Sequence, residues 1–269
     1  MNISVSRSTS AAILSRLDTL AHLSESDDGL TRQYLSAEHR EANELVGSWM
    51  REAGMRVHQD AIGNIIGRYE GEHEGAPALL IGSHLDTVVM AGKYDGMLGV
   101  VTAIQCVQDL HNRGIQMPFA IEVVGFADEE GVRFQSTYLG SRAIAGTFRK
   151  ELLEARDANG MTMADALRAF GLDPSQINTA AKRSEDVIAY LELHIEQGPV
   201  LESKDEPVGV VTAIAGATRR LVTLSGVAGH AGTVPMDHRQ DALLAAAECS
   251  LAVEKVAAKR THCVATVGR

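Results

Sequence analysis

Cysteine and clustered basic residues are both scarce in this sequence of 269 residues. Its three cysteines, Cys106, Cys249 and Cys263, are too few and too scattered for a disulfide framework or a thiolate metal site, and we expect core thiols in a reducing cytosol. No Lys/Arg cluster longer than a pair occurs, and the formal net charge is −10. Nucleic-acid binding is therefore not expected, because phosphates require a basic surface.

Long apolar runs are also missing. No uninterrupted stretch approaches the roughly 20 apolar residues of a membrane-spanning helix, and the N-terminus lacks the basic and apolar pattern of a secretion signal. These absences predict a cytoplasmic protein without a membrane partner. What is present, 45% hydrophobic residues and 25 glycines, favours a globular α/β protein with many tight turns.

The apolar patterns predict an α/β fold with a mixed, largely parallel sheet flanked by helices. A strand, a helix and a strand within 78–126 form a βαβ unit, which requires parallel pairing. In chain order we expect helices at 10–23 and 36–54, a strand hairpin at 55–69, a strand at 78–81, a helix at 96–114, a strand at 119–126, peripheral helices at 140–172 and a buried strand at 187–193.

A smaller second domain is expected after a segment of small and β-branched residues at 209–216, which suits a hinge. Its elements would be a strand at 220–225, a helix at 239–256 and a strand at 262–267. We therefore place one domain at 1–212 and part of a smaller α/β domain at 213–269.

Polar residues with metal-binding chemistry follow the predicted strands. His84 and Asp86 come directly after the first parallel strand, at the edge where open α/β sheets bind ligands. An imidazole at this edge can bind a metal, and a nearby carboxylate can orient the imidazole. The alternative is a polar turn. Asp95 precedes a helix and is our candidate for a carboxylate bridging two divalent ions, with a helix N-cap as the alternative.

Asp128, Glu129 and Glu130 follow the next strand, and three consecutive acids repel one another unless a cation is near. We expect Glu130 to be a metal ligand and Glu129 to face the metal-bound water as general base, because adjacent side chains diverge on an extended segment. The alternative is an exposed acidic turn. His194 ends the strand at 187–193 and is a further ligand candidate, or a core histidine.

Oxygen and imidazole donors suit Zn²⁺, Mn²⁺, Co²⁺ or Ni²⁺ without choosing among them. In the smaller domain, His230 lies in a glycine-lined loop, either as a surface residue or as a group that polarises the substrate when this domain closes or when a dimer forms. Arg219, Arg220 and Arg239 are the nearest candidates to bind an anionic substrate, although each is expected to be solvated. The Thr31–Arg32 pair is predicted to lie in a solvated loop, with a position that reaches an active site as the alternative.

Five motifs in this order resemble the M20-type binuclear metallohydrolases, and within them the group of allantoate amidohydrolases and N-carbamoyl-L-amino-acid hydrolases. The resemblance extends from about Gly29 to Arg269. The motifs are Gly-Ser-His-Leu-Asp-Thr-Val at 82–88, Tyr-Asp-Gly-Met-Leu-Gly at 94–99, Asp-Glu-Glu-Gly at 128–131, Leu-His-Ile-Glu-Gln-Gly at 193–198 and Gly-His-Ala-Gly-Thr-Val-Pro-Met at 229–236.

The resemblance implies a metal-dependent exopeptidase-like catalytic domain with part of a lid or dimerisation domain. It implies two divalent ions per subunit and a homodimer in which His230 reaches the neighbouring subunit's site. The implied roles are His84 and His194 on one metal, Asp95 as bridge, Glu130 on the second metal, Glu129 as general base, Asp86 orienting His84, and Gln197 and His230 contacting substrate.

Substrates of this group carry a ureido or carbamoyl nitrogen beside a carboxylate, and hydrolysis releases ammonia and CO2. The segments 126–134 and 139–142 look more like allantoate amidohydrolases, which implies purine catabolism; N-carbamoyl-L-amino-acid hydrolysis is the alternative. A non-catalytic interaction module that keeps the fold is the alternative of another class.

Family members continue beyond Arg269 and contribute a further metal-binding histidine. We therefore expect this chain to bind one metal well and the second poorly.

Overall fold

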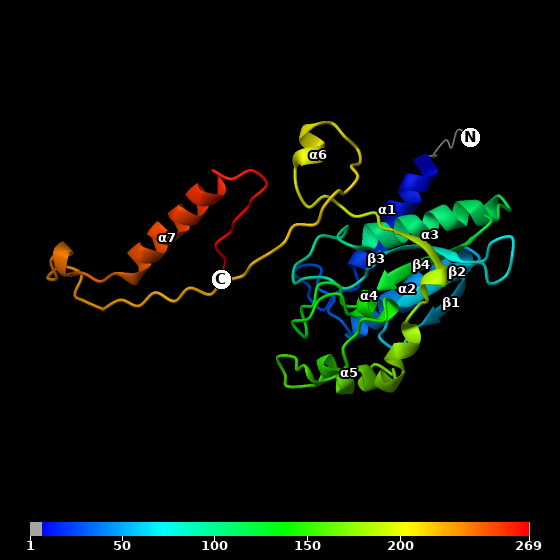
Figure 1. Ribbon diagram of the computed structural model, residues 1–269, viewed down its shortest axis with the longest axis horizontal. Helices are drawn as coiled ribbons and strands as arrows, with labels where there is room; N and C mark the ends of the chain where they lie inside the picture. Colours follow the sequence, from blue (N-terminus) through cyan, green and yellow to red (C-terminus); the bar gives the residue numbers. More distant parts are fainter. Residues whose placement is uncertain (1–6, 269) are drawn as a thin grey trace. The chain divides into compact units, whose positions relative to one another are not determined.

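The computed structural model describes residues 7–268, which Figure 1 colours along the chain. The contacts divide the chain into two compact units, and the division falls between Pro207 and Val208.

The first unit is built on a mixed sheet of five strands in the order β1-β2-β4-β3-β5. β1 and β2 form the predicted antiparallel hairpin, and β2 also pairs antiparallel with β4. β3 pairs in parallel with both β4 and β5, so these three strands end at the same edge of the sheet. The predicted mixed α/β fold is confirmed. The strands are β1 (Arg56–Gln59), β2 (Ile65–Tyr69), β3 (Ala78–His84), β4 (Ala120–Phe126) and β5 (Val187–Leu191).

One face of the sheet is covered by three helices, α1 (Arg7–Ala21), α2 (Ala37–Glu52) and α3 (Met97–Asn112) (Figure 1). Their apolar stripes form the main core with Ile121 and Val123 of β4. The predicted cap of α2 is confirmed, because Ser36 Oγ accepts a hydrogen bond from the backbone N–H of His39 at 3.1 Å.

The opposite face carries Leu80, Val124 and Phe126 and packs against Ile144 of α4. The predicted helices at 140–172 occur as short pieces, and residues of α4 and α5 form a second apolar cluster with Tyr34 and others. The short helical elements on this side are α4 (Leu139–Ile144), η1 (Lys150–Glu154), α5 (Met163–Ala169), η2 (Pro174–Ala180) and η3 (Ser184–Asp186).

Two burial predictions in the first unit are wrong. β5 was expected to be buried, yet Ile188 is 54% and Leu191 56% exposed, because this edge strand pairs only with β3 among the described residues. Cys106 was expected in the core, yet it is exposed on α3, and Cys249 and Cys263 are exposed as well.

The second unit contains η4 (Met236–His238) and the predicted helix as α7 (Ala242–Ala257). Asp241 caps α7 by accepting a hydrogen bond from the N–H of Leu243 at 2.9 Å. The strands predicted at 220–225 and 262–267 are not formed in the described part of this unit, because neither segment has a sheet partner there. In the part of the chain that the structure covers, no helix has the length and apolarity to cross a bilayer. One further helix, α6 (Val200–Ser203), precedes the division between the units.

Candidate metal centre

The candidate site lies where β3, β4 and β5 end together. His84 is the last residue of β3, Glu129 and Glu130 follow β4, and His194 follows β5. Asp95 lies just before α3, the helix that connects β3 to β4. The parallel register thus brings residues that are far apart in sequence to one edge of the sheet, as the sequence predicted.

Two glycines let α3 approach this edge closely. Gly96 has a φ of 80°, and a Cβ at this position would lie 2.5 Å from the His84 ring. A Cβ on Gly99 would lie 2.2 Å from the carbonyl oxygen of Leu193. Larger side chains would therefore push the helix away from both histidines.

His84 is buried, with 2% of its surface exposed. Its Nδ1 lies 2.8 Å from the backbone carbonyl oxygen of Asp86 and 3.8 Å from the Asp86 carboxylate. This arrangement turns Nε2 toward the site. Burial acts to lower the pKa of His84, but the Asp86 carboxylate, the hydrogen bond to the Asp86 carbonyl oxygen and the carboxylates of Glu129 and Glu130 together outweigh it, so the pKa is raised.

The Asp86 carboxylate holds the acidic turn after β4. Its two oxygens accept hydrogen bonds from the backbone N–H groups of Glu129 at 3.0 Å and Glu130 at 3.1 Å. Asp128 is buried and the two glutamates are partly buried, so the interpretation as an exposed acidic turn is wrong. Burial raises the pKa of both Glu129 and Glu130, which keeps protons on them more readily than on free glutamate.

Asp95 and His194 face each other on the other side of His84. His194 Nε2 lies 3.2 Å from an Asp95 oxygen, and the two imidazole rings of His84 and His194 stack at 5.7 Å. Gln197 Nε2 donates to both Asp95 oxygens, at 3.0 and 2.9 Å. The N-cap of α3 is Gly96, so the capping interpretation of Asp95 is wrong.

The donor atoms fall into two groups that share His84. One group is His84, Asp95 and His194, and the other is His84, Glu129 and Glu130; within each, one ligand atom per residue lies within 4.8 Å of the others. Imidazole nitrogen and carboxylate oxygen are the donors that Zn²⁺, Mn²⁺, Co²⁺ and Ni²⁺ accept. The residues present therefore fit a divalent ion. The expected divergence of the Glu129 and Glu130 side chains is wrong, because the chain leaves the extended conformation at Asp128, whose φ is 49°, and both carboxylates lie near His84.

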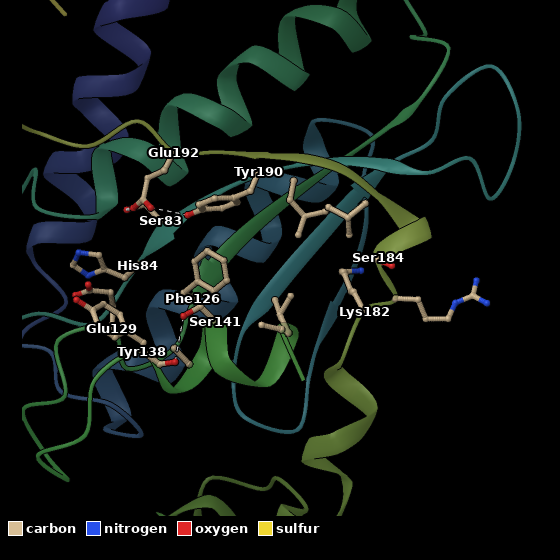
Figure 2. Close-up of a pocket in the computed structure, with 16 residues that line it drawn as sticks. Ser83, His84, Phe126, Glu129, Tyr138, Ser141, Lys182, Ser184, Tyr190 and Glu192 are labelled. Atoms are coloured by element: carbon tan, nitrogen blue, oxygen red, sulfur yellow. Dashed lines mark hydrogen bonds between the residues drawn. The ribbon is translucent and has the colours of Figure 1, made fainter. Parts of the chain in front are cut away.

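Glu192 is a residue of the site region that the sequence analysis missed. It accepts hydrogen bonds from Ser83 Oγ at 2.8 Å and from the Tyr190 hydroxyl at 2.7 Å (Figure 2). These contacts join the ends of β3 and β5. Its position two residues before His194, on the same strand extension, was the available signal.

A pocket of about 400 Å³ opens beside the candidate ligands. Figure 2 shows His84 and Glu129 at one end, Phe126 in the middle, and Lys182 and Ser184 at the other end. The volume suits a small molecule.

Arg32 and His230 are two further residues that the sequence singled out. Arg32 was expected in a solvated loop, but it is fully buried behind β3, so that prediction is wrong. His230 belongs to the second unit, is exposed, and accepts a hydrogen bond at Nδ1 from the Gly232 N–H at 3.1 Å.

The mixed sheet, its flanking helices and the His/carboxylate groups at the ends of parallel strands define an M20 exopeptidase-like fold. The sequence profile of peptidase family M20/M25/M40 matches residues 80–267, and the chain belongs to this family, as its motifs indicated. This family is metal-dependent.

Curated relatives match most of the chain. It is 48% identical to the N-carbamoyl-L-amino acid amidohydrolase of Geobacillus stearothermophilus, over 90% of this chain and 59% of the relative. It is 45% identical to allantoate deiminase 1 of Glycine max, over 90% of this chain and 51% of the relative. The chain thus spans about half to three-fifths of the length of these proteins.

Solved structures share the fold. A hydantoinase/carbamoylase family amidase from Burkholderia ambifaria superposes with a TM-score of 0.76 and 34% identity, covering 96% of this chain and 63% of that one. AtUAH in complex with glyoxylate gives a TM-score of 0.72 and 32% identity, covering 95% and 62%.

Proposed function

We propose that this chain provides the metal site of an amidohydrolase that cleaves a ureido or carbamoyl C–N bond in a small carboxylate substrate. The observation that carries the proposal is the convergence of imidazole and carboxylate donors from distant parts of the chain in two neighbouring groups, one with Asp95 and His194 and one with Glu129 and Glu130. Two neighbouring groups of donors suit a pair of divalent ions, which lie about 3.5–4 Å apart in two-metal sites. The names of the relatives support hydrolysis of a C–N bond.

The proposed ligands are His84, Asp95 and His194 on one side and Glu130 on the other, with Asp95 as the bridge. Asp86 positions this set, because its backbone carbonyl contacts His84 and its carboxylate holds the turn at Glu129.

Glu129 acts as the general base. When bound, a divalent ion lowers the pKa of water and polarises the substrate carbonyl. The Glu129 carboxylate accepts a proton from the attacking water and delivers it to the leaving nitrogen as the C–N bond breaks. Burial raises its pKa, which favours holding that proton between the two transfers. With one water, a ureido group R–NH–CO–NH2 yields R–NH2, CO2 and ammonia.

Allantoate is the proposed substrate, and relatives named allantoate deiminase support it at 44–45% identity. N-carbamoyl-L-amino acids are the second candidate, because a relative with that activity in its name is 48% identical. Gln197, next to Asp95, would contact the substrate, and His230 would be brought by the second unit, within one subunit or across a homodimer.

The proposed base is tested by Glu129→Gln in the metal-loaded chain. We expect hydrolysis to fall by at least about 100-fold, since general-base catalysis contributes about 10²–10⁴-fold, while bound metal stays near its original stoichiometry. Ammonia release and elemental analysis measure the two effects. Glu41→Gln, at an exposed position of α2, is the matched control and keeps full activity. Unchanged ammonia release in Glu129→Gln would reject Glu129 as base.

The substrate is decided by a panel of allantoate and N-carbamoyl-L-amino acids under identical metal loading. We expect a higher kcat/KM for allantoate. A preference for the N-carbamoyl compounds selects the second candidate. A chain that purifies and reloads without near-stoichiometric metal would be an interaction module instead.

A further inference from the structure

Arg32 joins the end of α1 to the end of β3. Its side chain is 0% exposed. Nε donates to the carbonyl oxygen of Leu85 at 2.8 Å, and one terminal nitrogen donates to the carbonyl oxygens of Leu20 and Leu23 at 2.9 and 2.8 Å. Leu20 and Leu23 lie at the C-terminal end of α1, where a cation is favourable. The guanidinium thus reaches the residue between His84 and Asp86.

The backbone of Arg32 forms hydrogen bonds with the same segment, residues 84–87. Its N–H donates to Thr87 Oγ1 at 2.8 Å, and the Thr87 N–H donates to the Arg32 carbonyl oxygen at 2.9 Å. Two residues of the segment 84–87 are therefore held by one partner. These contacts fix the conformation that presents the His84 and Asp86 side chains to the site.

The burial of this charge calls for an explanation. None of the hydrogen bonds of the Arg32 side chain goes to a carboxylate, and its second terminal nitrogen has no hydrogen-bond partner within residues 7–268. Burial lowers the pKa of Arg32 to about 10, and the negative charge of Asp86 acts in the opposite direction. Burying an ion that is not hydrogen-bonded to a carboxylate is unfavourable, so a gain in stability alone does not explain it.

We propose that Arg32 is a positioning residue of the metal centre. It fixes the backbone of residues 84–87, and its charge balances the Asp86 carboxylate that holds the turn at Glu129 and Glu130. Because it acts through His84 and Asp86, Arg32 touches neither substrate nor metal. The inference rests on the proposed metal site.

Co²⁺ titration of the full chain, followed by visible absorption, tests this role. Arg32→Met removes the charge and the hydrogen bonds at similar volume, and Arg32→Lys keeps the charge but loses the planar fork of guanidinium donors. Arg68→Met is the matched control: Arg68 is also largely buried, and it pairs with Glu122 at 2.9 Å and the Ala76 carbonyl oxygen at 2.7 Å, away from the strand ends. Thermal unfolding without metal records the loss of stability in each variant.

We expect Arg32→Met to weaken Co²⁺ binding by about 10–100-fold, as residues that orient ligands do, and to change the visible spectrum at saturation. Arg68→Met loses stability but keeps its Co²⁺ affinity within about twofold and keeps the wild-type spectrum. A merely structural role predicts instead that both variants lose stability and neither changes the spectrum. That result would overturn the proposal.

The other outcomes are also decisive. If Arg32→Met does not fold, Arg32→Lys takes its place, and Co²⁺ affinity and a spectrum equal to wild type in that variant overturn the proposal that the hydrogen bonds of the guanidinium fix residues 84–87. Weaker binding with an altered spectrum supports it. A wild-type chain that binds no Co²⁺ contradicts the proposed function itself, whereas wild-type binding with unaffected Arg32 variants contradicts only the role of Arg32.

Discussion

The two sides of the candidate metal centre are held in different ways. Glu129 and Glu130 lie on a turn whose backbone N–H groups are bound by the buried Asp86 carboxylate. Asp95 contacts both His194 and Gln197 through side chains, and His194 follows the exposed edge strand β5. One side is fixed by buried backbone contacts and the other by partly exposed side chains. The comparison teaches that the acidic side is the more preorganised half of the site.

His84 is the element common to both sides, so its loss gives the largest expected effect. His84→Ala removes one ligand from each donor group and should weaken Co²⁺ binding by more than about 100-fold. Calorimetric or absorption titration measures the affinity. His58→Ala, at an exposed position of β1, is the control and should bind as wild type. Equal affinities in the two variants would show that His84 is not a metal ligand.

Asp86→Asn tests the preorganised side. The amide keeps one acceptor oxygen, so one of the two backbone N–H groups of Glu129 and Glu130 loses its partner. We expect the free energy of unfolding to fall by about 1–3 kcal/mol, the cost of an unsatisfied buried donor. Urea denaturation of the metal-free chain measures this loss. An Asn variant as stable as wild type would show that the hydrogen bonds from Asp86 to the turn at Glu129 and Glu130 do not stabilise the fold.

Gly99→Ala tests the side that depends on β5. The new Cβ would meet the Leu193 carbonyl oxygen at 2.2 Å and Cβ of the buried Ser83 at 2.8 Å, and the Leu193 segment, which carries His194, is the one free to move away from α3. We expect about a tenfold loss of Co²⁺ affinity, with a smaller loss of stability than in Asp86→Asn, because an exposed segment yields more easily than a buried turn. Gly92→Ala adds a methyl where no atom lies within 4 Å and should leave affinity unchanged. A Gly99 variant that binds as tightly as this control would show that metal binding does not depend on the close approach of α3 to the His194 segment.

The sequence predicted the strand ends well because each is a local pattern. An apolar run followed by polar residues sets where β3 and β4 end, and therefore where His84 and Glu129 lie. Periodicity likewise predicted α3 and α7 to within a few residues.

What the sequence did not predict depends on distant partners. Arg32 is buried because its side chain donates hydrogen bonds to carbonyl oxygens of α1 and of Leu85, just after β3. No local sequence pattern predicts these contacts. β5 is exposed because it has one neighbouring strand in the described structure, although its apolar run is typical of a central strand. The turn of Glu129 toward His84 likewise follows from its contact with Asp86, more than 40 residues earlier in the chain.

The central claim is that one ion site is built on His84 from residues of three strand ends. Anomalous diffraction at the cobalt edge, from crystals of the chain grown with Co²⁺, tests it most directly. The account predicts a peak at about 2.0–2.2 Å from a His84 ring nitrogen, with a second ligand among Asp95, His194 and Glu130. Cobalt bound elsewhere on the molecule, with no peak next to His84, would contradict it.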